Sequence, residues 1–265
     1  MPEGPTLHRL ARVHQRNFAG REVRVSSPQG KFADGAALVD GHVLKKAEAW
    51  GKHLLHHYDS GLVVHVHLGL IGAFSESEVP MGPPVGQVRM RMVGAEFGTD
   101  LRGPTICEVL HEPELAAIAN RLGPDPLRRK ADPELAWARL HRSKRSIAAL
   151  LMDQSVVAGV GNVYRAELLF RRNMSPMLTG AGVSRAEWDA MWIDLVEMMK
   201  VGLRRGKIIT IRREDDHGEG SYAKGRPRTY VYRRAGLPCR ICGTPIQYTV
   251  LEGRNLFWCP TCQPD

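Results

Sequence analysis

Four of the five cysteines stand in two pairs with the same spacing. Two residues separate Cys239 from Cys242 and Cys259 from Cys262, and sixteen residues lie between the pairs. Two such pairs can place four thiolates around one Zn²⁺, and a zinc site closed by four protein ligands is structural. Disulfides are the alternative, but nothing in the sequence suggests export. The spacing therefore predicts one structural zinc ion per chain, with Cys107 left as a small core residue.

The residues Pro2 and Glu3 could carry a different chemistry. Once Met1 is removed, Pro2 would be a free secondary amine, and α-amines titrate at about 7.7–8.0 in model peptides. Attack of this amine on a sugar aldehyde carbon gives a permanently charged iminium, which acidifies the neighbouring C–H bond and promotes elimination. Glu3 would lie close enough to act as an acid or a base. Alternatively, both residues only begin a helix, where proline and glutamate are common.

The charge of the chain favours an anionic partner. Its 37 Lys and Arg outnumber 28 acidic residues, and 28 of the 37 are Arg. Twelve Lys or Arg and five acids lie between Arg204 and Arg254, so most of the excess positive charge is there. A concentrated basic segment is typical of a nucleic-acid binder, although a solubilising surface is the alternative.

Several common classes of protein are excluded. The sequence has no P-loop, no HExxH and no G-x-S-x-G motif, and the pair Gly159 and Gly161 lacks the third glycine of a dinucleotide-binding fingerprint. The apolar stretch from Ile147 to Met152 is too short to span a bilayer, and we expect no signal peptide, hence a cytoplasmic protein. Five histidines crowd two alternating segments and could be metal ligands, but no cluster of cysteines or carboxylates flanks them. We therefore interpret them as sheet-surface residues near DNA: His53, His56, His57, His65 and His67.

The elements that must position these residues form three blocks of an α+β multidomain protein. In residues 1–122, apolar spacing predicts a helix over Thr6–Phe18, and alternating residues at 23–25, 62–68 and 88–92 predict strands. This block is therefore expected to be an N-terminal helix followed by an antiparallel β-sandwich. Gly and Pro at 123–126 indicate a linker.

The second block, residues 127–211, is predicted to be helical. Helical spacing covers residues 135–140, 147–153, 164–170 and 188–201. A glycine-rich turn at 157–162 precedes the third of these helices, and Asn162 is a candidate cap for it. The exposed backbone N–H groups of such a helix start can hold a phosphate. The third block, residues 212–265, contains a Gly-rich polar loop and then the four-cysteine zinc ribbon.

These features occur together, in order, in one known family. The motifs are Met1-Pro2-Glu3-Gly4, Gly51-Lys52, the segment from Ala158 to Arg165, and the cysteine ribbon with Arg254 before its second pair. In this combination the chain resembles the formamidopyrimidine-DNA glycosylase and endonuclease VIII family over essentially its whole length. Gly4 and the segment Gly253–Pro260 are similar to the endonuclease VIII branch.

The resemblance implies a helix-two-turn-helix domain and a role for each matching residue. Pro2 would form a Schiff base with C1′ of the damaged nucleotide, and Glu3 would protonate the sugar to open its ring. Lys52 would contact a DNA phosphate and assist β-elimination. Asn162 would bind phosphate beside the lesion, and Arg254 would grip a flanking phosphate and assist δ-elimination.

The resemblance also implies further DNA contacts. Leu70 is a candidate wedge that fills the gap in the base stack, although this sequence departs from the family around it. Arg165, at the end of the glycine-rich motif, is a candidate DNA-binding residue. The charged loop from Arg213 to Arg226 is a candidate cover for the extruded base, or else only a mobile loop.

The sequence thus predicts a bifunctional DNA glycosylase and AP lyase that removes oxidised pyrimidines and cleaves the strand by β,δ-elimination. The expected partner is damaged double-stranded DNA with abasic sites or oxidised bases, with single-stranded or forked DNA as a second possibility. We expect a monomer in the cytoplasm, associated with the nucleoid and not with membranes. Two alternatives stay open: the same fold acting on oxidised purines or as an AP lyase only, and a non-catalytic binder of damaged DNA.

Overall fold

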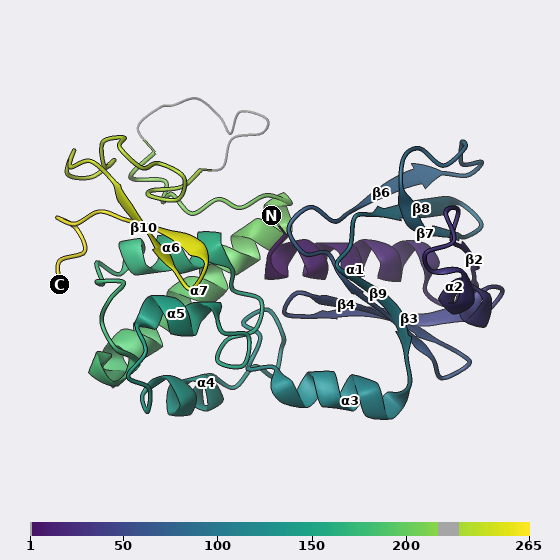
Figure 1. Cartoon of the computed structure of the whole chain (residues 1–265), viewed down its shortest axis with the longest axis horizontal. Coiled ribbons are helices and arrows are strands. Elements are labelled where there is room, and N and C mark those ends of the chain that lie inside the picture. The colour runs from purple at the N-terminus through teal and green to yellow at the C-terminus, as the bar shows by residue number, and fades with distance from the viewer. Residues whose placement is uncertain (1, 217–227) are drawn as a thin grey trace. The chain divides into compact units, whose positions relative to one another are not determined.

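The computed structural model describes residues 2–216 and 228–265. The chain forms two compact units, Met1–Arg121 and Leu122–Asp265 (Figure 1). Most of the charged loop expected to cover a base lies outside the described residues. Among the helices described, none is both long and apolar enough to cross a membrane.

The first unit is built around two antiparallel sheets, as the sequence predicted. The five-stranded sheet has the order β1-β3-β4-β5-β9 and the four-stranded sheet the order β2-β7-β8-β6. The strands are β1 (Arg21–Glu22), β2 (Arg24–Ser26), β3 (Val43–Trp50), β4 (His53–Tyr58), β5 (Val63–His67), β6 (Ala73–Glu78), β7 (Val88–Val93), β8 (Phe97–Arg102) and β9 (Ile106–Leu110). The strands expected at 62–68 and 88–92 are β5 and β7.

The core of this unit lies between the sheets and helix α1 (Gly4–Phe18). Leu7 and Phe18 of α1 are fully buried together with Leu54 of β4 and Met90 of β7. Side chains alternate along β7, which places its apolar row, including Met90 and Met92, in this core. The helix packs on β3 and β4, so its N-terminal residues are anchored to the five-stranded sheet (Figure 1).

Two further helices of the first unit were not predicted from the sequence. They are α2 (Ala33–Val39) and α3 (Glu112–Arg121). The first is only seven residues long, and the second has no fully buried residue, so neither has a strong apolar stripe. Leu115 and Ile118 of α3 pack on Leu55 of β4 and Val63 of β5, which lie on the face of the sheet away from the main core.

The second unit contains the predicted helices and the ribbon hairpin. Its elements are α4 (Pro133–Leu140), α5 (Ile147–Met152), α6 (Asn162–Arg171), the 3₁₀ turn η1 (Gly180–Gly182), α7 (Arg185–Arg205), β10 (Gln247–Leu251) and β11 (Arg254–Trp258). A capping box between Ser184 and Glu187 begins α7, and Gly206 in the left-handed conformation ends it. Helix α6 packs against α5, α7 and β11, so the helices and the hairpin share one core (Figure 1).

Candidate active site

Pro2 and Glu3 lie immediately before helix α1. Glu3 is the N-cap residue, with extended backbone angles, and its carbonyl oxygen accepts a hydrogen bond from the Thr6 N–H at 2.8 Å. Its carboxylate makes no capping hydrogen bond, yet the residue is 0% exposed. A glutamate is rarely buried unless its charge has a use or a partner. Burial therefore distinguishes Glu3 from a solvent-exposed residue at a helix start.

Lys52 lies in the two-residue turn that joins β3 to β4. Trp50 and His53 pair across this turn, and Gly51 has a φ of +57°, a conformation that side chains other than glycine rarely adopt. The Gly51-Lys52 dipeptide is thus a hairpin turn, and Lys52 is presented half-buried at its tip. Helix α1 packs on both strands that this turn connects, so Pro2 and Glu3 at the start of the helix and Lys52 in the turn belong to elements that pack together in the first unit.

Leu70 lies in the turn that follows β5. Gly69 has a φ of +65°, and the Gly72 N–H closes the turn on the Leu68 carbonyl oxygen at 2.9 Å. Leu70 is 53% exposed and its neighbour Ile71 is 84% exposed. Two large apolar side chains displayed on a tight turn are available for insertion into another surface.

Asn162 lies at the start of helix α6, but the prediction that it caps this helix is wrong. The N-cap is Gly161, and Asn162 is the first residue of the helix. Its Nδ2 donates to the Asn255 carbonyl oxygen of β11 at 2.8 Å, and its Oδ1 accepts from the Arg165 guanidinium. The side-chain amide therefore joins the helix start to the strand that begins with Arg254, a tertiary contact that replaces the local one.

Arg165 is almost fully enclosed, at 1% exposure. Besides Asn162, its guanidinium reaches the Asn255 carbonyl oxygen at 3.3 Å. Because the guanidinium is engaged within the protein, its contribution to DNA binding would be to hold Asn162 and the hairpin in place.

Gln154 holds together the two turns between α5 and α6. Its Oε1 accepts from the Gly159 N–H at 2.9 Å, and its Nε2 donates to the carbonyl oxygens of Met152 at 3.0 Å and Val160 at 2.9 Å. Gly159 has a φ of +91°, which explains why glycine is present there. These hydrogen bonds hold the loop that leads into Gly161 and Asn162 at the start of α6.

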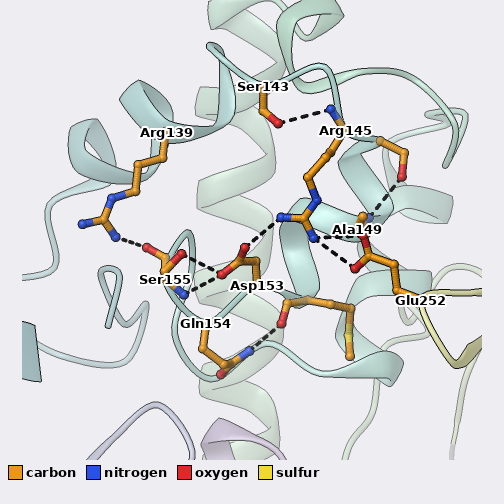
Figure 2. A network of polar contacts seen from close by, with 10 residues as sticks. Arg139, Ser143, Arg145, Ala149, Asp153, Gln154, Ser155 and Glu252 are labelled. Atoms are coloured by element: carbon orange, nitrogen blue, oxygen red, sulfur yellow. Dashed lines mark hydrogen bonds and ion pairs between the residues drawn. The ribbon is translucent and has the colours of Figure 1, made fainter. Parts of the chain in front are cut away.

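Arg145 joins this loop to the hairpin, and no sequence motif indicated it (Figure 2). Its guanidinium donates to Asp153 at 2.8 Å and to both carboxylate oxygens of Glu252 at 3.0 Å. Although burial opposes ionisation of Asp153, hydrogen bonds from Ser155 and Arg145 lower the pKa of that carboxyl. The bridge holds the turn that immediately precedes Arg254, which is exposed at the start of β11.

The four paired cysteines meet at one point of the second unit. Their sulfur atoms all lie within 4.8 Å of one another, and the distances are 3.9 Å from Cys239 to Cys262 and 3.5 Å from Cys242 to Cys259. Tetrahedral zinc with Zn–S bonds of about 2.3 Å needs sulfur separations of roughly 3.8 Å. The donor set and its spacing therefore fit a structural zinc ion.

Family models match nearly the whole chain. The formamidopyrimidine-DNA glycosylase N-terminal domain matches residues 1–105, the H2TH domain of the same glycosylase matches residues 122–214, and the zinc finger found in FPG and IleRS matches residues 236–264. Endonuclease 8 1 of Mycobacterium tuberculosis is 64% identical over 267 residues, which cover 99% of this chain and 100% of that protein. The chain belongs to the formamidopyrimidine-DNA glycosylase and endonuclease VIII family. This confirms the resemblance drawn from the sequence motifs.

More distant relatives match this chain over their full length, and the solved structures among the matches share its fold. A formamidopyrimidine-DNA glycosylase of Paraburkholderia phytofirmans is 31% identical over 286 residues, covering 99% of this chain and all of that protein. The Lactococcus lactis Fpg in complex with DNA containing an abasic site has a TM-score of 0.81 at 18% identity, with 99% and 100% of the two chains covered. MutM in complex with DNA containing carbocyclic 8-oxo-G has a TM-score of 0.80 at 20% identity, and all of both chains is covered. At these identities the solved structures establish the family fold alone.

Zinc removal is expected to disorder the ribbon that carries Arg254. Structural zinc sites contribute about 10–16 kcal/mol of apparent binding free energy in zinc-finger peptides, so a strong chelator or Cys259→Ser should weaken binding to abasic-site DNA at least about tenfold. Metal analysis should find one zinc per wild-type chain and none in the variant. Cys107→Ser, which alters the cysteine outside the cluster, should keep both the zinc and the affinity. Full DNA affinity in a metal-free protein would contradict the structural role.

Proposed function

We propose that this chain is a bifunctional DNA glycosylase and AP lyase that removes oxidised pyrimidines and then cleaves the DNA strand. The observation that carries the proposal is the Pro2-Glu3 pair before α1, with Glu3 fully buried, in a chain 64% identical to an endonuclease 8. Membership of the family makes the chain an enzyme, and a non-catalytic binder of damaged DNA would need neither residue. The prediction from the sequence that the chain is an enzyme is therefore confirmed.

The chemistry begins at the N-terminal amine. After removal of Met1, the Pro2 nitrogen attacks C1′ of the damaged nucleotide, while Glu3 donates a proton to the ring oxygen of the sugar. The base leaves, and the Pro2 nitrogen and C1′ form an iminium. Loss of a C2′ proton then expels the 3′ phosphate, and a second elimination expels the 5′ phosphate, giving β,δ-elimination. No redox cofactor is required, because each step transfers only protons and a leaving group.

Phosphate contacts would hold the extruded nucleotide. Extrusion costs a few kcal/mol, and contacts to flanking phosphates offset that cost without reading the sequence. We assign these contacts to Lys52, Asn162 and Arg254, with the N-terminus of α6 adding its backbone N–H groups. Arg165 would support Asn162, and Leu70 would enter the base stack. The exposure of Leu70 and the rigid bridge beside Arg254 support these assignments.

The partner and location follow from the same reaction. Damaged double-stranded DNA is the proposed substrate, with single-stranded or forked DNA as a second form, and the solved relatives bound to abasic-site and Fapy-dG DNA support this class of partner. We propose a monomer that acts in the cytoplasm on the nucleoid. The excess of positive charge supports a polyanionic partner.

A panel of defined lesions tests the choice of substrate. We expect base release from a matched thymine glycol duplex to exceed release from an 8-oxoguanine duplex by at least about tenfold, since oxidised purines are the alternative and a mismatched pocket costs roughly 1–3 kcal/mol. A plain abasic-site duplex in the same assay measures strand cleavage alone, and the product ends distinguish β- from β,δ-elimination. Preferred release of 8-oxoguanine would favour the purine alternative, and cleavage without any base release would favour a lyase only.

A further inference from the structure

Arg254 immediately follows a tight turn that contains a residue other than glycine in the left-handed conformation. Glu252 and Gly253 form the turn between β10 and β11, with φ angles of +47° and +73°, and Leu251 pairs with Arg254 across them. Positive φ at both central residues defines a two-residue hairpin turn in which asparagine followed by glycine is the favoured pair. The turn itself therefore gives no reason for a glutamate at position 252.

The side chain of Glu252 is held by Arg145, as Figure 2 shows. Nη2 of Arg145 donates to both carboxylate oxygens of Glu252 at 3.0 Å, and Nη1 donates to Oδ2 of Asp153 at 2.8 Å. A guanidinium is planar and rigid, so it sets the angle between its two partners as well as their distances. Arg145 precedes the N-cap of α5 and Asp153 is its C-cap, so the bridge spans this helix and ends on the hairpin turn.

Asp153 is in turn fixed to the loop that leads to α6. Its Oδ1 accepts hydrogen bonds from the Ser155 N–H at 3.0 Å and the Ser155 hydroxyl at 2.6 Å, which leaves Oδ2 for Arg145 (Figure 2). Gln154, the next residue, binds the Val160 carbonyl oxygen at the far end of the same loop. The bridge therefore connects the loop before Asn162 to the turn before Arg254.

Arg254 lies between two such connections. On one side Glu252 is bound by Arg145, and on the other the carbonyl oxygen of Asn255 is bound by the Asn162 amide at 2.8 Å. A single connection lets the tip of a hairpin pivot about it, whereas connections on both sides of a residue also fix its direction. Arg145 and Arg254 line the same hollow, which has a volume of about 220 Å³.

We propose that Arg145 is a positioning residue: by clamping the turn between β10 and β11 to the loop before α6, it holds Arg254 in place relative to Asn162, so that both contact the DNA backbone at once. The inference rests on the proposed function, in which Arg254 assists δ-elimination. In that step C4′ loses a proton, and the electrons of that bond pass through the conjugated iminium to break the C5′–O bond and expel the 5′ phosphate. Arg145 touches neither that phosphate nor the sugar, because two carboxylates engage its guanidinium.

A direct contact of Arg145 with DNA is the competing role, and it has the opposite consequence for Glu252. Removing an acid beside a polyanion strengthens its binding and would release Arg145 to reach a phosphate. If Arg145 acts through Glu252, loss of that carboxylate instead weakens the δ step. Glu252→Asn is the suitable variant, because asparagine before glycine preserves this type of turn while the longer carboxylate is lost.

The product ends formed in single-turnover cleavage of an abasic-site duplex measure the two eliminations separately. We expect Arg145→Ala and Glu252→Asn each to slow the δ step about fivefold relative to the β step, within the range for residues coupled in one network. The double variant should lose no more than either single variant, since both remove the same bridge. In an Arg254→Ala background, Arg145→Ala should have no further effect on the δ step.

Arg185→Ala is a matched control in the same unit. Arg185 also binds two carboxylates, those of Glu134 and Asp189, and its side chain is 50% exposed, against 45% for Arg145. Its loss removes the same charge and the same kind of bridge at a distance from the hairpin in sequence. The ratio of δ to β product should stay at the wild-type value.

Four results would each overturn the inference. They are an unchanged product ratio in Arg145→Ala, a faster δ step in Glu252→Asn, an equal loss in Arg185→Ala, and a further fivefold loss in the Arg254→Ala background. A loss of thermal stability without a change in product ratio is the first of these results, because a purely structural bridge does not distinguish the two eliminations.

Affinity for a duplex with a tetrahydrofuran abasic analogue separates this inference from the proposed function. That measurement needs no chemistry, and both Arg145→Ala and Glu252→Asn should bind more weakly than Arg185→Ala. If the wild type cleaves no abasic site but this difference in affinity persists, the proposed enzyme activity fails while the positioning role stands. If the wild type cleaves and neither readout distinguishes Arg145→Ala from Arg185→Ala, only the positioning role fails.

Discussion

Replacing Pro2 with glycine is expected to reduce the borohydride-trapped complex with abasic-site DNA about a hundredfold, the loss typical of a reacting group misplaced by about 1 Å. Borohydride reduces an iminium to a stable amine, so the amount of covalent complex reports how much Schiff base forms. The secondary amine of proline gives an iminium that cannot lose a proton from nitrogen, whereas the iminium formed by the primary amine of an N-terminal glycine can. Glycine also lacks the ring that fixes the amine before α1.

The control for this experiment is a second proline in the same helix start. Pro5 lies in the first turn of α1 and is buried, so Pro5→Gly perturbs the helix without changing the N-terminal amine. It should trap DNA nearly as well as the wild type. Mass spectrometry must show that each protein begins at residue 2. A wild-type protein that begins at Pro2 and forms no covalent complex would remove the lyase from the proposed function.

Features encoded by local spacing were predictable from the sequence. The two cysteine pairs indicate zinc because four identical ligands must converge, and the sulfur atoms do converge. Helical spacing predicted α4 to α7 because apolar residues recur at helical intervals in each of them, and α7 buries such a stripe, which includes Trp188 and Met191. The alternating strands β5 and β7 were predictable for the same reason, with a period of two.

Features that depend on distant partners were not predictable. Arg145 meets Glu252 across 107 residues, and Glu108 meets His65 only because of the strand register. The same limit explains the wrong cap: the amide of Asn162 is engaged by the Asn255 carbonyl oxygen, which local sequence does not encode. His56 was expected on the sheet surface, but it is fully buried, and its Nε2 lies 2.9 Å from Nδ1 of His14 in α1. His65 of β5 was expected there as well and is only 1% exposed.

Glu3→Gln is expected to separate the two activities of the enzyme. Release of a damaged base should fall about 10²–10⁴-fold, the usual contribution of a positioned general acid, because glutamine cannot protonate the sugar ring oxygen. Cleavage at a preformed abasic site should change less than about tenfold, since that sugar already opens to an aldehyde which the Pro2 nitrogen can attack. Both rates can be measured on one duplex pair, with thymine glycol in one and an abasic site in the other.

The size of this separation decides between the two roles of Glu3. Glutamine is nearly isosteric with glutamate, so the fully buried site is filled in both proteins. If Glu3 only begins α1, the substitution acts through stability, and both activities should fall together with the melting temperature. Glu22→Gln removes an exposed carboxylate of the same unit and should leave both rates unchanged. If only base release is lost, Glu3 acts as a proton donor. A weakened start of α1 would lower both activities, because it affects the enzyme equally on a damaged nucleotide and on an abasic site.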